Sequence, residues 1–521
     1  MFKKIIILLA LLAPAGLKAQ PDQYKAATEK IGQLFEWINN QYVDTVNFGT
    51  LTEDVIRQTL RQLDPHSMYI SKDEVRAMNE QLEGSFDGIG VSFNILNDTI
   101  LITSAIDGGP SQKIGITGGD KIITVNGEDV AGKGITTTDV TRKLRGPRGT
   151  NVLVGIKRRG HAELLTFNIV RDRIPHHSVV AAYKVTDRIG YIKLSRFAAP
   201  SKREFDDALK KLKNEGVTDL ILDLTGNGGG YMNISILLAN EFLDRGQMIV
   251  YTEGVNSPRR VHNANARGEF RTGNLVVMLD EISASASEIL AGAIQDWDRG
   301  TIVGRRSFGK GLVQSQLTFA DSSMLRLTVA HYFTPTGRSI QKPYNTNDDE
   351  YARGGVRNTR LQSGELTSET TITDDMPKYT TLSQKRTIYG GGGIIPDVFV
   401  PIDTSFNTRY YRELIGRGYF NQFMLRYVDR NRQDINHLYP TFALFDQNFE
   451  VTEAILEELQ DFAEKEGLSK NPDMFARSRE HLKMWIKGYI ARDLWEMSEM
   501  YEIVNRGDPI FLKAVEVLSE K

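Results

Sequence analysis

The sequence predicts a multidomain α/β protein, because the spacing of its apolar residues changes along the chain. The spacing is three to four residues near the N-terminus, two residues in the next stretch, mixed through the long middle part, and helical again after Pro401. At 521 residues the chain is too long for one ordinary core. The expected parts are a separate leader (1–19), a helical segment (20–83), a small β domain (84–172), an α/β core (173–404) and a helical C-terminal domain (405–521).

The first 19 residues have the pattern of a signal peptide. Lys3 and Lys4 precede an apolar run, 5–12, that is too short to span a bilayer, and cleavage is expected near Ala19. The chain contains no cysteine, so neither a lipid-modified cysteine nor a disulfide is available. An exported chain without cysteine fits a bacterial periplasm, where a free thiol would risk oxidation.

The composition and the spacing of the histidines argue against some classes of function. Hydrophobic residues make up 40% and charged residues 25%, as in soluble globular proteins. The formal net charge of −2 argues against a broad surface for nucleic acid. None of the eight histidines has the HxxxH or HExxH spacing of a metal site, so we expect no metal and no cofactor.

The segment 20–83 is expected to be helical. LFEWI at 34–38 and VIRQTLRQL at 55–63 place apolar residues at three- and four-residue intervals. LDPHSMYI at 63–70 then ends the segment with an Asp-Pro turn.

Residues 84–172 are expected to form hairpins around one helix. The stretch 88–106 turns at Asn97-Asp98, a strand over 118–130 ends at an Asn-Gly turn, 136–144 is a short capped helix, and 151–170 is a second hairpin. A small β-barrel of this kind resembles a PDZ domain. The segment Gly88-Ile89-Gly90-Val91 falls where that family binds a terminal carboxylate, just before the strand that a bound peptide extends. A glycine-rich hairpin without a ligand is the alternative.

Strands and helices alternate through the α/β core, which predicts a mainly parallel sheet. A helix is expected over 200–216, and 218–224 is an apolar strand of the kind that is buried on both faces. That strand runs into the glycine-rich TGNGGG at 225–230. Residues 344–380 are rich in small polar residues and are expected to form a mobile insertion, whereas the apolar stripes after residue 405 indicate a helical accessory domain.

Three serines follow the next buried strand, 274–280. Ser283, Ser285 and Ser287 alternate with alanines where the strand gives way to a helix. A helix N-terminus stabilises a developing oxyanion and favours an ionised hydroxyl, so one of them could be a nucleophile. Ser285 has an alanine on each side, which leaves room for a substrate. The alternative is capping, with Ser283 as the cap and Ser287 in the first turn.

A nucleophilic serine needs a base, and Lys310 is the candidate. In SFGKGLVQ (307–314) this lysine lies between glycines and apolar residues, and burial would lower its pKa and supply a neutral amine. A Ser-His site stays open, because a triad is assembled in space and not in sequence. The G-x-S-x-G elbow of an α/β esterase is absent around these serines.

Together these residues resemble the carboxy-terminal processing peptidases, the tail-specific serine proteases of peptidase family S41. The resemblance covers about residues 30–400, and its motifs occur in the family's order. They are LDPHSMYI, the PDZ segment, LILDLTGNGGG, SASASE, Lys310 with Gln314 four residues on, YFTPTGRSIQ (332–341) and GGGIIPDV (391–398).

The resemblance implies a ClpP/crotonase-like protease core that cleaves proteins selected by their C-termini through the PDZ domain. It implies a nucleophile, a general base, a residue that orients the base, and an oxyanion hole. In that order these are Ser285, Lys310, Gln314, and the N–H of Ala286 with one from Gly229 or Gly230. Asp296 matches a family acid, for which we expect a structural role. The resemblance also leaves room for an adaptor, a lipoprotein partner or a homo-oligomer.

One position departs from the family pattern. The family has Asp-Leu-Arg before its glycine-rich loop, and here Thr225 stands where arginine is expected. The bracing of that loop, or the switching of activity, is therefore in doubt. The alternative reading of the whole chain is a catalytically inactive, PDZ-bearing binding or scaffold relative on the same fold.

Overall fold

The computed structural model describes residues 21–265, 267–344, 355–369, 372–373 and 376–520. The predicted signal peptide lies outside these residues. No helix within these ranges has the length and apolar character that a membrane crossing requires. The chain divides between Leu63 and Asp64 into two compact units.

The first unit contains two helices, as the apolar spacing predicted. They are α1 (Pro21–Gln41) and α2 (Phe48–Arg61). The side chain of Asn47 caps α2 by accepting a hydrogen bond from the N–H of Thr50.

The second unit begins at Asp64, within LDPHSMYI, and there the structure adds a strand that the prediction of helices ending in an Asp-Pro turn did not include. Residues Met68–Ile70 form strand β1, which pairs antiparallel with β18 (Met324–Phe333), and α3 (Lys72–Glu83) follows. The Asp64 carboxylate accepts hydrogen bonds from the N–H groups of His66 and Ser67 and so sets the turn into β1. Three residues are too few to show a strand period, and the partner strand lies far along the chain.

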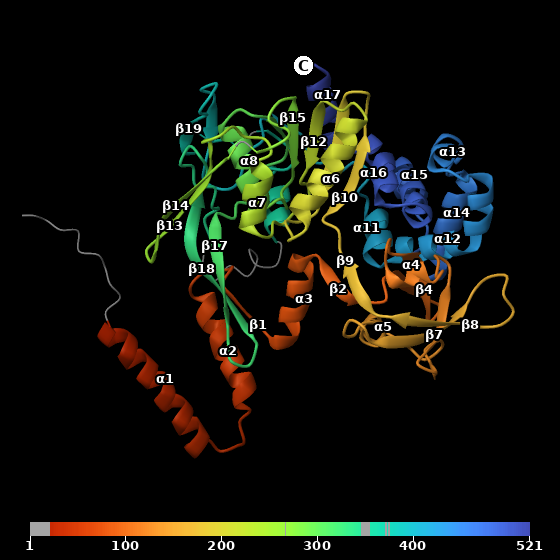
Figure 1. Cartoon of the computed structure of the whole chain (residues 1–521), viewed down its shortest axis with the longest axis horizontal. Helices are drawn as coiled ribbons and strands as arrows, with labels where there is room; N and C mark the ends of the chain where they lie inside the picture. The colour runs from red at the N-terminus through yellow and green to blue at the C-terminus, as the bar shows by residue number, and fades with distance from the viewer. Residues whose placement is uncertain (1–20, 266, 345–354, 370–371, 374–375, 521) are drawn as a thin grey trace, which may run out of the picture. The chain divides into compact units, whose positions relative to one another are not determined.

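The predicted PDZ domain is a small barrel with short helices (Figure 1). Its sheet has the order β3-β4-β5-β7-β8, β6 pairs with β5, and β2 pairs with β9. Asn97 and Asp98 both have positive φ (49° and 52°), as a two-residue hairpin turn requires. Its elements are β2 (Ser85–Gly88), β3 (Val91–Leu96), β4 (Thr99–Ala105), α4 (Pro110–Lys113), β5 (Lys121–Val125), β6 (Glu128–Asp129), α5 (Thr137–Leu144), β7 (Asn151–Lys157), β8 (Leu165–Val170) and β9 (Asp172–Pro175).

The α/β core is built on a six-stranded sheet of order β10-β11-β12-β15-β16-β21, in which only β10 is antiparallel to its neighbour. A second sheet joins β1, β18, β13 and β14, with β17 paired to β18. The strands of the first sheet are β10 (Val179–Lys184), β11 (Ile189–Leu194), β12 (Asp219–Asp223), β15 (Leu275–Leu279), β16 (Thr301–Gly304) and β21 (Val398–Phe399). Those of the second are β13 (Met248–Gly254), β14 (Ser257–Asn263) and β17 (Leu312–Thr318).

Helices cover both faces of the six-stranded sheet, which explains why every residue of β12 and β15 is buried (Figure 1). On one face lie α6 (Ser201–Asn214), α7 (Met232–Ala239) and α8 (Ala286–Asp296). On the other lies α17 (Pro509–Ser519), whose Phe511 packs on Tyr191. The catalytic candidates therefore follow strands that are fixed by packing on both sides.

The stretch predicted as a mobile insertion contains ordered elements where it is described. These are α10 (Gly355–Gln362), β19 (Lys378–Thr380) and, just beyond, β20 (Thr387–Tyr389). Arg360 is 2% exposed and donates hydrogen bonds to the carbonyls of Arg306 and Ser307. The described part of the insertion thus has secondary structure held by hydrogen bonds, and its mobility stays a prediction.

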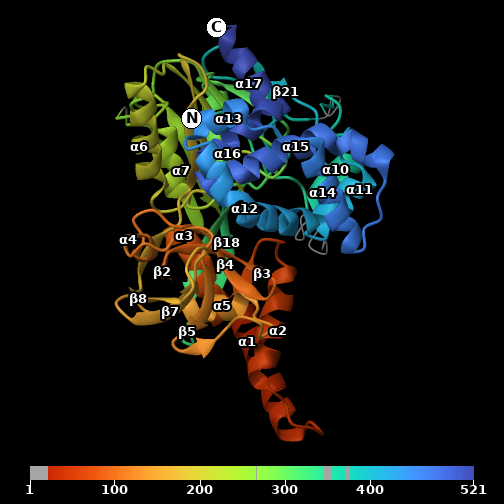
Figure 2. The ribbon, with the colours of Figure 1, turned by 90° about the vertical axis from the view of Figure 1, so that its right-hand side faces the viewer.

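The C-terminal region is helical, as predicted, and most of its helices share one core (Figure 2). They are α11 (Arg409–Gly416), α12 (Tyr419–Leu438), α13 (Phe442–Asn448), α14 (Glu453–Lys465), α15 (Pro472–Leu494) and α16 (Met497–Val504), followed by the short η1 (Asn505–Gly507). The last helix, α17, leaves that group and packs on the six-stranded sheet of the α/β core.

Candidate active site

Ser285 occupies the turn between β15 and α8 in an unusual backbone conformation. Its φ is 56° and its ψ is −110°, a region that residues other than glycine rarely adopt. It is the N-cap of α8, and its N–H donates a hydrogen bond to Glu288 Oε2 at 2.7 Å. A strained serine at a helix N-terminus is held there by its surroundings and presents its side chain to the adjacent space.

The hydroxyls of the other two serines donate hydrogen bonds to backbone carbonyls. Ser283 Oγ donates to the carbonyl of Leu224 at 2.8 Å, and Ser287 Oγ donates to the carbonyl of Asn227 at 2.9 Å. Both side chains are fully buried. The prediction that Ser283 caps the helix is wrong, since the cap position belongs to Ser285. Ser283 and Ser287 instead connect the serine turn to the glycine-rich loop after β12.

That glycine-rich loop, residues 225–230, lies directly against the serine turn. A Cβ atom on Gly229 would stand 2.9 Å from the Ser285 Cβ and 3.1 Å from the Ala286 nitrogen, so only glycine fits. The Gly229 N–H donates to Asn227 Oδ1 at 2.9 Å. This bond uses the Gly229 N–H within the loop. Gly230, by contrast, lies at the cleft described below.

Lys310 lies just before β17. Its Nζ donates to Gln314 Oε1 at 3.0 Å, and Gln314 Nε2 donates to the carbonyl of His66 at 2.5 Å. Burial, and secondarily the positive charge of Arg326, lowers the pKa of Lys310 to about 8. A substantial fraction of this amine is therefore neutral in mildly alkaline solution. Sequence reasoning missed the His66 carbonyl, because it comes from a segment far away in the chain.

Glu288 joins the serine turn to the lysine loop. Its Oε2 accepts hydrogen bonds from the N–H groups of Ser285 and Lys310, at 2.7 and 2.9 Å. Its Oε1 accepts from Ser307 Oγ and the Gly309 N–H, at 2.6 and 2.7 Å. The side chain is fully buried, and burial raises the pKa of Glu288 although these four donors act in the opposite direction. In the sequence Glu288 was only an acid in the first turn of a helix.

Ser285 and Lys310 open into one cleft of about 450 Å³. Gly230, Gln314 and Arg326 supply polar walls. Leu82, Tyr231, Met232, Ile289, Leu312, Val313 and Tyr332 supply apolar and aromatic ones. A cleft that combines apolar walls with converging polar groups suits a peptide side chain beside its scissile bond.

No histidine is among the described residues that line this cleft. His66 is the imidazole near Lys310, and its ring packs edge-on against Phe308 and Tyr344. Burial, with the charge of Lys310, lowers the pKa of His66 to about 4. Across the described parts of the chain, no three His, Cys, Asp or Glu side chains are placed to hold a metal ion.

Asp296 does not line the cleft. It is fully buried at the C-terminal end of α8, where Arg338 Nη2 donates to its Oδ1 at 2.7 Å and the Thr336 N–H donates to its Oδ2 at 2.9 Å. These contacts fit the structural role expected for it.

The predicted peptide-binding loop of the PDZ domain joins β2 to β3. Gly90 has a φ of 73°, and Val91 begins β3. The Ile89 side chain is buried in the domain core, and its carbonyl accepts hydrogen bonds from the N–H and Oγ of Ser111. Gly88 closes β2. The assignment of these four residues to carboxylate binding stays a prediction.

Comparison with known proteins identifies the relatives of this chain. Residues 188–351 match the family described as peptidase family S41, residues 101–158 match the PDZ domain, and residues 410–496 match a family of unknown function. The carboxy-terminal-processing protease of Bartonella bacilliformis is 36% identical over 322 residues, which are 60% of this chain and 72% of the relative.

The carboxy-terminal processing protease CtpB of Bacillus subtilis is 33% identical over 332 residues, 63% of this chain and 68% of the relative. Among solved structures, a photosystem II D1 C-terminal processing protease is 30% identical and covers 60% of this chain and 83% of its own, with a TM-score of 0.35.

Proposed function

The chain belongs to peptidase family S41 and is a serine-type carboxy-terminal processing protease with a PDZ domain, and we propose that Ser285 and Lys310 carry its chemistry. The observation that supports this assignment most is that both line one cleft, where burial lowers the pKa of Lys310 to about 8. Among the described lining residues, Lys310 is the one able to exchange a proton near neutral pH.

In this mechanism Ser285 Oγ attacks the carbonyl carbon of the scissile peptide bond while the neutral Lys310 amine accepts the hydroxyl proton. The C–N bond then breaks as the Lys310 ammonium returns that proton to the leaving amine, and an acyl ester remains on Ser285. A water molecule, deprotonated by Lys310, hydrolyses the ester and restores both residues. Gln314 orients the amine through its 3.0 Å hydrogen bond.

The oxyanion of each tetrahedral intermediate would be stabilised by backbone N–H groups beside Ser285. Ala286 offers the first N–H of α8, and Gly230 is the favoured second donor because the Gly229 N–H already donates to Asn227. Fixed donors of this kind are each worth about 3 kcal/mol of barrier.

The PDZ domain would select substrates by their C-termini. The Gly88–Val91 loop would take the terminal carboxylate, and the edge of β3 would extend the peptide as an added strand. We further propose that residues 1–19 are a signal peptide, that the enzyme works in the periplasm, and that the C-terminal helices are the site for any adaptor, lipoprotein partner or second copy of the chain.

Digestion of an unfolded casein-like protein tests the central assignment. The wild type should cleave it and should react with a fluorophosphonate probe, whereas Ser285→Ala should do neither. Cleavage by Lys310→Ala at the wild-type rate would overturn the Ser/Lys assignment and revive a histidine base. A wild type that neither cleaves nor labels would favour the inactive scaffold alternative, which no observation in the structure favours.

A further inference from the structure

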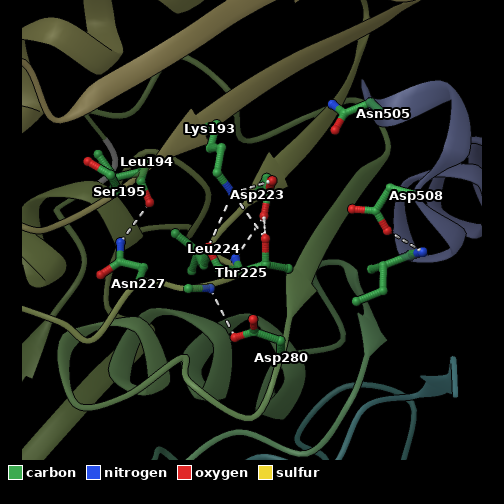
Figure 3. Close-up of polar contacts among 12 residues, drawn as sticks. Lys193, Leu194, Ser195, Asp223, Leu224, Thr225, Asn227, Asp280, Asn505 and Asp508 are labelled. Atoms are coloured by element: carbon green, nitrogen blue, oxygen red, sulfur yellow. Dashed lines mark hydrogen bonds and ion pairs between the residues drawn. The ribbon is translucent and has the colours of Figure 1, made fainter. Parts of the chain in front are cut away.

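A buried lysine stands beside Thr225, at the start of the glycine-rich loop (Figure 3). Lys193 belongs to β11, the strand next to β12, and its side chain is 10% exposed. Its Nζ lies 2.7 Å from Asp223 Oδ2, 3.0 Å from Thr225 Oγ1 and 3.2 Å from the Thr225 carbonyl oxygen. One ammonium group therefore contacts the last residue of β12 and both oxygens of the first loop residue.

Asp223 also holds Thr225, through the carboxylate oxygen that does not contact Lys193. Its Oδ1 accepts hydrogen bonds from the N–H and the Oγ1 of Thr225, both at 2.7 Å, and its Oδ2 also accepts from the Tyr191 hydroxyl at 2.6 Å. Asp223 is 2% exposed, and a buried carboxylate is tolerated only when it is paired and hydrogen-bonded. Burial alone would lower the pKa of Lys193, but Asp223 outweighs this effect and raises it, so Lys193 stays charged.

Two contacts connect the loop that begins at Thr225 to the turn that carries Ser285. The N–H of the next residue, Gly226, donates to Asp280 Oδ1 at 3.0 Å, and Asp280 lies at the start of the serine turn. Four residues after Thr225, Gly229 packs against Ser285 so closely that a Cβ would not fit. A shift at Thr225 must therefore move the loop relative to Ser285 or break these contacts.

The C-terminal helices cover this network on the face of the sheet opposite α6, α7 and α8. The Tyr501 ring lies 5.2 Å from Lys193 Nζ, and Asn505 donates to the Tyr183 hydroxyl at 2.8 Å. Asp508 is close enough for Asp223 and Lys193 to influence its pKa, which burial raises. Figure 3 shows Asn505 and Asp508 on this C-terminal segment. Water therefore has little access to the ion pair and cannot readily take the place of either partner.

We propose that Lys193 is the positioning residue of the oxyanion loop, supplying from β11 the cation that the family pattern carries at the position of Thr225. The inference rests on the proposed role of residues 225–230 in transition-state stabilisation. Lys193 touches no substrate; it acts through Asp223 and Thr225 on the placement of the Gly230 N–H. The departure at Thr225 is then a relocation of the cation to the neighbouring strand, and not the loss of the brace.

Paired substitutions separate this role from a merely structural one. Lys193→Met should lower kcat on the order of 10- to 100-fold with KM changed less than about threefold, because donors of this loop act on the transition state. Lys193→Arg should retain most of kcat. Thr225→Arg alone should also lower kcat, since it adds a second cation beside Lys193. The double variant Lys193→Met/Thr225→Arg should recover kcat to within about threefold of the wild type.

The matched control is Lys184→Met, on the adjacent strand β10, whose partner Asp187 is fully exposed; its kcat should equal that of the wild type. If Lys193→Met does not fold, the charge-balanced double variant carries the test, compared with Lys193→Met/Thr225→Met. A wild-type kcat in Lys193→Met, or a double variant no better than Lys193→Met, overturns the proposal. Failure of the underlying Ser/Lys assignment is distinguishable, because Ser285→Ala would then remain active.

Discussion

Two glycine-rich loops of this chain, residues 88–91 and residues 225–230, look alike in sequence and differ in their surroundings. Loop 225–230 is tied to its neighbours by Asn227, Asp280 and the Lys193 ion pair. Loop 88–91 connects two strands, and it is held by the buried Ile89 and by the hydrogen bond that the Ile106 N–H donates to the Gly90 carbonyl, with no ion pair at these four residues. The difference fits the two proposed ligands: an oxyanion that exists only in the transition state needs donors fixed in advance, whereas a substrate carboxylate is present throughout.

The largest effects should separate catalysis from tail binding completely. Ser285→Ala and Lys310→Ala are expected to lower kcat/KM by about 10⁴-fold or more, and Lys310→Arg should fail as well because a guanidinium stays charged. Gln314→Ala should cost less than either. Binding of a labelled C-terminal peptide, measured by fluorescence anisotropy, should be unchanged in all four variants. Loss of peptide binding in Ser285→Ala would mean that the two loops do not act separately.

Adding one methyl group to each loop compares them directly. Gly229→Ala should lower kcat on the order of 100-fold, because its Cβ would stand 2.9 Å from the Ala284 carbonyl oxygen and the backbone has a φ of 104°. Gly90→Ala, at φ 73° with only the Ile174 and Pro110 side chains within 3.2 Å, should weaken tail binding and leave kcat on a tail-less peptide unchanged. Equal losses of kcat in both variants, in steady-state kinetics, would contradict the division.

A change in pH should alter the rate of catalysis and leave the selection of substrate tails unchanged. Lys310 must be neutral to act, so kcat/KM should rise about tenfold per pH unit below its pKa of about 8 and level off above it. The ratio of rates for a good and a poor C-terminal tail should stay constant between pH 6 and 9, because a terminal carboxylate is ionised throughout that range. A rising limb near pH 6.5 that disappears when one histidine is replaced would identify a different base.

The smallest effect should be the choice of substrate tail. A substrate that ends in small apolar residues with a free carboxylate should be cleaved several-fold faster than the same chain ending in an amide or in Asp. Deleting residues 84–172 should remove this preference. Equal rates for the three versions would leave the protease site intact and end the assignment of loop 88–91 to carboxylate binding.

The fold was predictable to the extent that each element carries its own pattern. The hairpin at Asn97-Asp98, the buried strands β12 and β15 and the C-terminal helices follow from local spacing and turn residues, and the structure confirms them. Strand β1 and the ordered α10 were missed. Both depend on partners elsewhere, β18 for the first and the carbonyls held by Arg360 for the second.

The sequence by itself determined the family, the order of the domains and the residues that converge on one cleft, because an ordered set of short motifs identifies them without knowledge of their contacts. Only the tertiary structure decided how those residues are supported: Glu288 joins Ser285 to Lys310, and Lys193 reaches Thr225 from the next strand. These contacts join residues 3 to 32 positions apart across strands and turns. Hydrogen bonds and ion pairs form between atoms that are adjacent in space, and that adjacency exists only after the sheet has assembled.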